Sequence, residues 1–390
     1  MDTKKPTLRE LLNKIAEEKH YENYEIDIKE LLCGGANITS ELYTAVISAT
    51  NKDDLHIFAK VSVIGENLRA VMPPSFFYTE AYCYTTLWNT YRALEEENDL
   101  QDEHRLRFTK SYGFDLTRPQ ETAILENLMA QGYDVFDRRK SVDWSYAATA
   151  ITELAKLHSL SFAYRQSNPE EFDSVVTYVK KDWNEAAMVY FEQIGLADAM
   201  KYANPEHLEK LQRYLNDRLK NVLVNSFAPM SHVVLVHADY KPSNLMHRVL
   251  ETGKVDIKIV DLQTLQGGSP VTDLLYFIFT GSDEQFRAQY YEKLIDHYYQ
   301  ELSAALKRLH LNPDQIYSRQ NFDEELKEKL PFGLALAVFT LPVITVDTDK
   351  APKVNESMEI TDFSVSNTSE LYKERLNGVI NDYVRWGVLK

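Results

Sequence analysis

Two carboxylates and one amide stand near the ends of two predicted strands, where a rigid scaffold can hold reactive groups at fixed distances. The apolar run Val233–Val236 predicts a buried strand, and the sequence HADYKPSN that follows contains Asp239 and Asn244. A second predicted strand, Val255–Val260, is followed directly by Asp261. Phosphoryl transfer from ATP needs one carboxylate as a base for the acceptor hydroxyl, and an amide with a second carboxylate to hold magnesium. This spacing favours phosphoryl transfer; the alternative is a β-hairpin rich in Asp and Asn that performs no chemistry.

The pattern H-x-D-x-x-x-x-N followed by V-D-x-Q resembles the protein-kinase-like superfamily, whose loop reads H-R-D-L-x-x-x-N with D-F-G downstream. The resemblance implies that Asp239 is the catalytic base. It also implies that Asn244 and Asp261 hold Mg²⁺ and that His237 supports the loop. Lys241, which precedes a proline, is similar to the Lys of Ser/Thr kinase loops that reaches the γ-phosphate, and is a further catalytic candidate.

Strand-like patterning dominates the region after an opening amphipathic helix at residues 7–19. The predicted strands are Tyr24–Leu32, Glu41–Ala49 and Asp54–Val63. The turn between the first two strands contains Gly34, Gly35 and Asn37. Because glycine has no Cβ, backbone amides in such a turn can approach a phosphate. These three residues are therefore candidate nucleotide contacts, although an ordinary hairpin turn fits the same sequence.

Lys60 lies between apolar neighbours in the middle of the third strand, where its ammonium group must project into solvent or find an anion. A helix predicted from a Ser75 cap to Leu94 carries Glu80 next to its apolar stripe. We expect Glu80 to pair with Lys60, as in kinases, where this pair orients the phosphates of the nucleotide. The alternative is a solvated Glu80 on the surface.

The remaining pattern completes an α+β fold with two lobes. Two further strands, Arg105–Ser111 and Glu121–Leu128, give a five-stranded antiparallel sheet with one helix, and most of the later chain is helical. Within these later helices, His158 is interpreted as a bonded core residue, and Asp273 as a residue that caps the backbone of the catalytic loop. We expect an N-lobe at residues 1–128, which binds the nucleotide, and a C-lobe at residues 129–390, which holds the catalytic loop and acceptor pocket.

Composition excludes several classes of partner. The formal net charge of −16 over 390 residues argues against binding to nucleic acid or to an anionic membrane. The start of the chain does not resemble a signal peptide, and the apolar run Phe332–Val346 is short for a membrane span, so it predicts a buried helix. The two cysteines, Cys33 and Cys83, are too few for a disulfide framework. These features predict a cytoplasmic protein.

The acceptor is expected to be a small molecule. Asp273 follows Asp261 by only twelve positions. A protein kinase needs a far longer segment there, ending in A-P-E, to form a platform for a peptide. Surplus aromatic residues in the helical region at 171–225 could line an apolar acceptor pocket.

Four short motifs in the same order resemble the insect ecdysteroid-kinase-like family, which is related to the choline and aminoglycoside kinases. The resemblance extends over roughly residues 25–385. The motifs are LENL at 125–128, similar to an L-E-D-L hinge; LAKLHSLS at 154–161, similar to L-A-x-x-H-A-x-S; VDLQ at 260–263, similar to V-D-F-Q; and SPVTDLLYF at 269–277, similar to S-P-x-x-D-L-x-Y-F.

Family membership would imply phosphorylation, with ATP and Mg²⁺, of a hydroxyl group on an ecdysteroid or a similar polyhydroxylated compound, in an insect protein. It would also place Glu126 and Leu128 in the hinge beside adenine. Three departures concern Ala238, where the family has Gly, the Tyr-Lys-Pro-Ser sequence after Asp239, and the Ala-Asn pair after Gly35. Alternatives are a kinase of another small alcohol (choline-like, aminoglycoside-like or a plant toxin) and a non-catalytic scaffold that binds a nucleotide or hormone.

Overall fold

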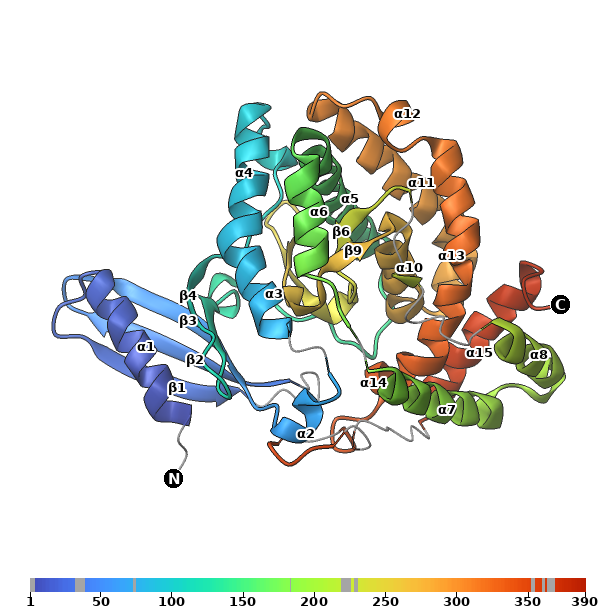
Figure 1. Cartoon of the computed structure of the whole chain (residues 1–390), viewed down its shortest axis with the longest axis horizontal. Helices are drawn as coiled ribbons and strands as arrows, with labels where there is room; N and C mark the ends of the chain where they lie inside the picture. The colour runs from blue at the N-terminus through green and yellow to red at the C-terminus, as the bar shows by residue number, and fades with distance from the viewer. Residues whose placement is uncertain are drawn as a thin grey trace.

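Alternating side chains build a five-stranded antiparallel sheet in the first third of the chain. The computed structural model describes residues 4–31, 39–72, 75–182, 184–218, 226–227, 231–351, 355–359, 362 and 369–390. The strands are β1 (Glu25–Leu31), β2 (Ser40–Ala49), β3 (Lys52–Ser62), β4 (Ser111–Asp115) and β5 (Thr122–Glu126). Their order is β1-β2-β3-β5-β4, and Figure 1 shows this sheet as a separate lobe beside a larger helical lobe. The predicted α+β, two-lobed architecture is confirmed.

Helix α1 (Lys4–Glu18) lies along the sheet (Figure 1). Its residues Leu8 and Leu12 are almost fully buried because they pack against Tyr43 and Ile57 on the apolar face of β2 and β3. The predicted helix at 7–19 is therefore confirmed, with one turn more at its start. This packing gives the sheet its own small core.

The predicted helix 75–94 is a continuous helical segment in three parts. These are α3 (Phe76–Tyr82), a π-helical turn (Cys83–Leu87) and α4 (Trp88–Glu97). Ser75 occupies the predicted N-cap position, but its side chain makes no capping hydrogen bond. A short helix, α2 (Glu66–Arg69), precedes this segment and was not predicted. Cys83 is a buried free thiol, and Cys33 lies outside the described residues.

The strand predicted at Arg105–Ser111 is wrong, because β4 begins where that prediction ends. The backbone N–H of Leu106 donates to the Glu95 carboxylate of α4 at 2.7 Å, and the Leu106 side chain is buried. Phe108 packs against Trp88, with ring centroids 4.5 Å apart. Contacts with α4 thus divert residues 105–108 from the sheet, and contact with β5 begins at Lys110, whose carbonyl accepts from the Glu126 N–H at 2.8 Å.

The helical lobe surrounds two short strand pairs, β6 with β9 and β7 with β8. Its strands are β6 (Val234–Val236), β7 (Leu245–Val249), β8 (Val255–Ile259) and β9 (Gln266–Gly268). Its labelled helices are α5 (Trp144–Ser167), α6 (Pro169–Tyr178), α7 (Glu185–Tyr202), α8 (Leu208–Arg218), α10 (Pro270–Gly281), α11 (Glu284–Arg308), α12 (Pro313–Ile316), α13 (Arg319–Phe339), α14 (Leu341–Thr345) and α15 (Glu370–Arg385). None of these described helices, nor those of the first lobe, combines the length and apolar character that crossing a membrane requires.

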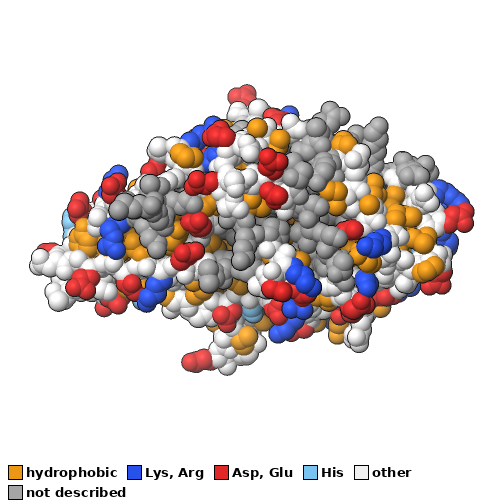
Figure 2. Space-filling model, turned by 90° about the horizontal axis from the view of Figure 1, so that it is seen from below, with side chains coloured by type: hydrophobic (Ala, Val, Ile, Leu, Met, Phe, Trp, Pro, Cys, Tyr) orange, Lys and Arg blue, Asp and Glu red, His pale blue; other side chains and the backbone are white. Residues whose placement is uncertain are grey.

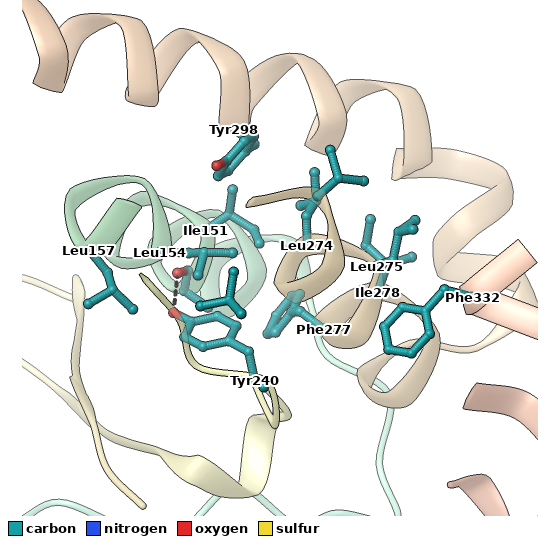
Figure 3. Packing of buried hydrophobic residues seen from close by; sticks show 14 of the residues in the cluster. Ile151, Leu154, Leu157, Tyr240, Leu274, Leu275, Phe277, Ile278, Tyr298 and Phe332 are labelled. Carbon is teal, nitrogen blue, oxygen red and sulfur yellow. Dashed lines mark hydrogen bonds between the residues drawn. The ribbon is translucent and has the colours of Figure 1, made fainter. Parts of the chain in front are cut away.

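The core of this lobe lies between α5, α10 and the loop after β6. Figure 3 shows Tyr240 and Phe277 packed among aliphatic side chains such as Leu154, and the Tyr240 hydroxyl donates to the Ala150 carbonyl at 2.7 Å. The apolar run at 332–346 forms the end of α13 and all of α14, so the prediction of a buried helix is confirmed.

A segment between α14 and α15 returns to the first lobe. Met358 is 3% exposed and packs with Ile64 and Leu68 beside α2. The Glu356 carbonyl oxygen lies only 1.8 Å from the point where a Cβ on Gly65 would stand. Glycine at position 65 is therefore required for this close approach.

Asp273 in the first turn of α10 fixes the loop that follows β6. Its carboxylate accepts from the backbone N–H groups of His237 at 2.6 Å and Ala238 at 2.8 Å. His158 lies 3.2 Å from the same carboxylate, and its other ring nitrogen is 2.7 Å from the Tyr298 hydroxyl. Asp273 and His158 are both fully buried. Asp273 thus caps the loop, and His158 is a bonded core residue, as predicted.

We expect Asp273→Ala to lower the free energy of unfolding by about 3 kcal/mol or more, because it leaves two buried N–H groups and a buried imidazole without their acceptor. Urea denaturation measures this. Asp283→Ala is the matched control, since Asp283 caps the partly exposed start of α11 through one bond to Phe286 N–H, and it should cost about 1 kcal/mol. Equal losses in the two variants would contradict the anchoring by Asp273.

Candidate functional site

Two strand ends bring the predicted catalytic residues to one place. The loop after β6 runs from His237 to a 3₁₀ turn at Pro242–Asn244, and Asp261 follows β8. The N–H of Val260 donates to the Asn244 carbonyl at 3.0 Å, which fixes one loop against the other. Strand pairing between β7 and β8 therefore sets the separation of the two loops.

Lys60 joins the two lobes through two carboxylates. Its Nζ lies 2.9 and 3.1 Å from the Glu80 oxygens and 2.6 Å from Asp261 Oδ1. Lys60 is 5% and Glu80 1% exposed, which excludes the alternative of a solvated Glu80. The predicted contact between Lys60 and Glu80 is present, and it links β3 and α3 to the loop after β8.

Burial and the neighbouring charges act differently on the three groups of this cluster. Burial alone would lower the pKa of Lys60, but Asp261 and Glu80 outweigh it and raise that pKa. Burial raises the pKa of Glu80, whereas the Lys60 ammonium outweighs burial at Asp261 and lowers its pKa. Of the two carboxylates, Glu80 and Asp261, Asp261 is thus the more firmly ionised.

Asp239 lies at the centre of a second set of contacts. Its carboxylate accepts from Lys241 Nζ at 2.5 Å and from Asn244 Nδ2 at 2.9 Å. Tyr276 of α10 lies near Asp239, and burial together with this carboxylate raises the pKa of its hydroxyl. Tyr276 was not predicted as a site residue, because its neighbours in α10 are apolar and read as core.

His237 is completely buried and cannot contact a substrate directly. Its Nε2 lies 2.9 Å from the Val260 carbonyl, and its own carbonyl accepts from the Thr264 hydroxyl at 2.9 Å. These bonds connect the loop after β6 with the loop after β8. The position of His237 fits the supporting function that its sequence context implied.

Two residues beside these contacts have left-handed backbone conformations. Ala238 has φ +63° and Asp261 has φ +64°. Asp adopts this region several times more often than most residues, whereas Ala is strained there. The family that the sequence motifs resemble carries glycine at this position, and glycine would remove the strain.

Asn244 and Asp261 offer the kind of oxygen ligands that a magnesium ion binds. The Asn244 amide nitrogen donates to the backbone and side chain of Asp239, both at 2.9 Å, which turns its amide oxygen away from them. Within the described residues, that oxygen and the second carboxylate oxygen of Asp261 accept no hydrogen bond. Such hard oxygen donors are those that Mg²⁺ prefers.

The predicted hinge supplies backbone groups and no free carboxylate. Glu126 ends β5, and its side chain accepts from Lys258 Nζ at 2.6 Å and Gln131 Nε2 at 2.8 Å. Burial would raise the pKa of Glu126, but these donors lower it. The N–H of Leu128 has no acceptor in the described part of the chain. The predicted loop residues Gly34, Gly35 and Asn37 lie outside the described residues.

Lys181 is a buried cation that the sequence pattern did not single out. Its Nζ lies 2.5 Å from Thr79 Oγ1 and 3.2 Å from Ser75 Oγ, at the start of the helix that carries Glu80. The surrounding sequence, Lys180-Lys181-Asp182, has the pattern of a solvated turn. Lys181 instead connects the end of α6 to α3.

We expect Ala238→Gly to raise the free energy of unfolding by about 1 kcal/mol, because glycine adopts the left-handed region without strain. Ala238→Val should lower it by at least as much, since a β-branched side chain tolerates this region poorly. Urea denaturation at constant m-value measures both changes. A loss of stability in Ala238→Gly would contradict the strain at this position.

Lys181 should make stability depend on pH. Burial lowers the pKa of Lys181 from 10.5 to about 7. Between these values the unfolded chain binds a proton here that the folded protein does not, so the free energy of unfolding rises with pH through this window. We therefore expect Lys181→Met to be more stable than the wild type at pH 6, with an advantage that shrinks by pH 9. Urea denaturation at both values is the measurement, and Lys180→Met, at an exposed position, is the control. An advantage of equal size at both pH values would contradict this expectation.

The sequence model of the Ecdysteroid kinase-like family matches residues 34–311, and no protein of curated function matches the chain. Among solved structures, an aminoglycoside-3'-phosphotransferase of type VIII is 11% identical, with a TM-score of 0.34, and the match covers 82% of this chain and 99% of that protein.

Two further structures are similar at the same level. An aminoglycoside phosphotransferase from Streptomyces rimosus, in complex with ADP and streptomycin, is 11% identical over 82% of this chain and 98% of its own, with a TM-score of 0.31. A glucosamine kinase is 13% identical over 86% and 82%, with a TM-score of 0.35. At these values the structural likenesses say nothing about function, and the family match is decisive because it spans more than half of the chain. The chain belongs to the Ecdysteroid kinase-like family and is a phosphotransferase that acts on a hydroxyl group of a small molecule.

Proposed function

We propose that this phosphotransferase uses ATP and Mg²⁺ to phosphorylate a hydroxyl group of an ecdysteroid or a similar polyhydroxylated, partly apolar compound. The observation that carries the proposal is the buried cluster in which Lys60 contacts both Glu80 and Asp261. A buried ammonium group held by two carboxylates from different lobes is suited to orient nucleotide phosphates. The family match supports the choice of acceptor class.

Asp239 is the proposed base. The acceptor oxygen attacks the γ-phosphorus, its proton passes to Asp239, and the bond between the γ-phosphorus and the bridging oxygen of ADP breaks. Lys241 and Asn244 hold the Asp239 carboxylate in place through their hydrogen bonds. His237 positions the loop and takes no part in proton transfer.

Charge compensation accounts for most of the proposed catalysis. Lys60 orients the α- and β-phosphates, and Lys241 can turn from Asp239 toward the γ-phosphate. Asn244 and Asp261 would hold Mg²⁺, which supplies positive charge beside the phosphates when bound. Adenine would be held by main-chain groups near Glu126 and Leu128, and the phosphates by Gly34, Gly35 and Asn37.

A compact connection between Asp261 and Asp273 supports a small acceptor. A 3₁₀ turn at Leu262–Thr264, strand β9 and the start of α10 occupy almost the whole connection. No stretch of it is left to form a peptide platform of the kind that protein kinases use.

The same proposal includes a lobe boundary at residues 128/129, a cytoplasmic location and an insect origin.

The first test is phosphate transfer from Mg-ATP to ecdysone, read by mass spectrometry. The wild type should form a phosphorylated steroid, and Asp239→Asn should form it about 10²- to 10⁴-fold more slowly, because the base is lost. Binding of Mg-ATP, followed by calorimetry, should be nearly unchanged in the variant. Equal loss of transfer and of nucleotide binding would refute the assignment of Asp239 as the base.

The same pair of measurements separates the alternatives. Tight binding of Mg-ATP without a steroid product would mean that the acceptor is a different small alcohol. Absence of both binding and product would favour a non-catalytic scaffold.

A further inference from the structure

Lys181 contacts the start of the helix that carries Glu80. It follows the end of α6 by three residues and is only 7% exposed. Its Nζ donates to Thr79 Oγ1 at 2.5 Å and to Ser75 Oγ at 3.2 Å. The same ammonium group lies 5.6 Å from the centre of the Phe76 ring. A side chain from the helical lobe therefore grips the first turn of α3 and the residue before it.

No carboxylate compensates this buried amine. Among the described residues Lys181 forms no ion pair, and its neighbour Asp182 pairs with Lys180 at an exposed position. Burial lowers the pKa of Lys181 from 10.5 to about 7. The helix dipole also opposes a cation at the start of a helix. The position of Lys181 therefore costs stability, and such a cost is expected where a residue serves a functional site.

The contact of Lys181 lies one residue from a member of the Lys60 cluster. Thr79 directly precedes Glu80, whose two carboxylate oxygens lie 2.9 and 3.1 Å from Lys60 Nζ. Hydrogen bonds weaken steeply when they are misaligned, so a shift or rotation of α3 would weaken this pair. Ser75 makes no capping hydrogen bond with α3. The contact with Lys181 thus takes the place of a cap in fixing the start of the helix.

The other contacts of α3 also lead to the helical lobe. Figure 1 shows α3 at the boundary between the sheet and that lobe. The helix packs against the 3₁₀ turn at Leu262–Thr264, directly after Asp261. Tyr82 at its end lies against Tyr178 of α6, with ring centroids 5.4 Å apart. Lys181 adds polar bonds at the opposite end of α3, where they fix the helix against α6.

We propose that Lys181 is a positioning residue, which sets the orientation of α3 from the helical lobe and thereby keeps Glu80 in contact with Lys60. Its effect on the nucleotide rests on the function proposed above, because Lys60 directs the phosphates only while Glu80 holds it in place. Lys181 acts through Thr79 and takes no part in the reaction. The alternative is that Lys181 has no influence on the pair of Lys60 and Glu80.

The pair can be followed without nucleotide or acceptor. The protein is acetylated with the N-hydroxysuccinimide ester of acetic acid, and the rate at each lysine is read by mass spectrometry. Lys60 is protected because it is buried and paired. We expect Lys181→Met and Thr79→Val each to raise the acetylation rate of Lys60 about fivefold or more, because a looser α3 opens the pair more often.

An internal reference distinguishes this local effect from general loosening. Lys329 of α13 is 8% exposed and donates to the Ser226 carbonyl at 3.0 Å, and its acetylation rate should stay that of the wild type. An equal rise at Lys60 and Lys329 would overturn the proposal. An unchanged rate at Lys60 in Thr79→Val would do the same, and this variant keeps the test valid if Lys181→Met does not fold.

Two matched variants isolate the hydroxyl that Lys181 contacts. Thr79→Ser keeps that hydroxyl and should retain the Lys60 rate of the wild type. Thr85→Val removes a hydroxyl from the same helical segment, but Thr85 is exposed and donates to the Ala81 carbonyl of its own helix at 2.7 Å. This variant should also leave the Lys60 rate unchanged. A rise in Thr85→Val as large as that in Thr79→Val would contradict a specific role of Lys181.

Binding of Mg-ATP tests the consequence for the nucleotide. Lys181→Met and Thr79→Val should each weaken the affinity measured by calorimetry about fivefold or more, and the double variant should bind no more weakly, since both changes remove one contact. Unchanged affinity beside faster acetylation of Lys60 would overturn the link to the nucleotide. If the wild type does not bind Mg-ATP, the function proposed above fails, whereas acetylation of Lys60 still decides whether Lys181 positions α3.

Discussion

The ammonium group of Lys60, held between Glu80 and Asp261, is the interaction on which the arrangement of the site depends. It lies on β3, and its partners lie on α3 and after β8, so three segments far apart in sequence meet at one buried charge. Removing Lys60 would leave the buried Glu80 carboxylate without its cation, which typically costs about 3–5 kcal/mol. The contacts of Lys60 thereby fix the relative positions of β3, α3 and the loop after β8.

A second buried charge organises the helical lobe in a similar way. Asp273 is fully buried, yet its carboxylate is satisfied by two backbone N–H groups and by His158. These bonds hold Ala238 in a conformation that alanine does not favour. The core of the lobe therefore fixes the loop that carries Asp239, independently of any ligand.

Sequence patterns were sufficient where one physical requirement dominated. A Lys among apolar strand residues must reach solvent or find an anion, and Glu80 beside an apolar stripe, together with the likeness to kinases, predicted the contact that Lys60 makes with Glu80. An Asp inside an apolar helix needs donors, which predicted the capping by Asp273. The strand at 105–111 was misplaced because strand propensity is local, whereas the hydrogen bond from the Leu106 N–H to Glu95 that diverts this segment depends on the tertiary fold.

Other site residues carried no signal that a single sequence could provide. Tyr276 lies in an apolar helix, and only the three-dimensional packing brings it near Asp239. Lys181 lies in a charged stretch of a kind that usually faces solvent, so its burial could not be predicted from composition. On the face shown in Figure 2, acidic side chains are spread among basic and apolar ones.

The return of the chain from the helical lobe to α2 makes the two lobes mechanically dependent on each other. Met358 is buried by Ile64 and Leu68, although the helices on either side of it, α14 and α15, pack in the opposite lobe. Separation of the lobes must carry this segment along with the sheet or expose the Met358 side chain, which costs about 1.5–3 kcal/mol. The lobes are thus joined at two places far apart in sequence, by the chain that follows β5 and by the contact of Met358 with Ile64 and Leu68, so any relative motion of the lobes acts on both.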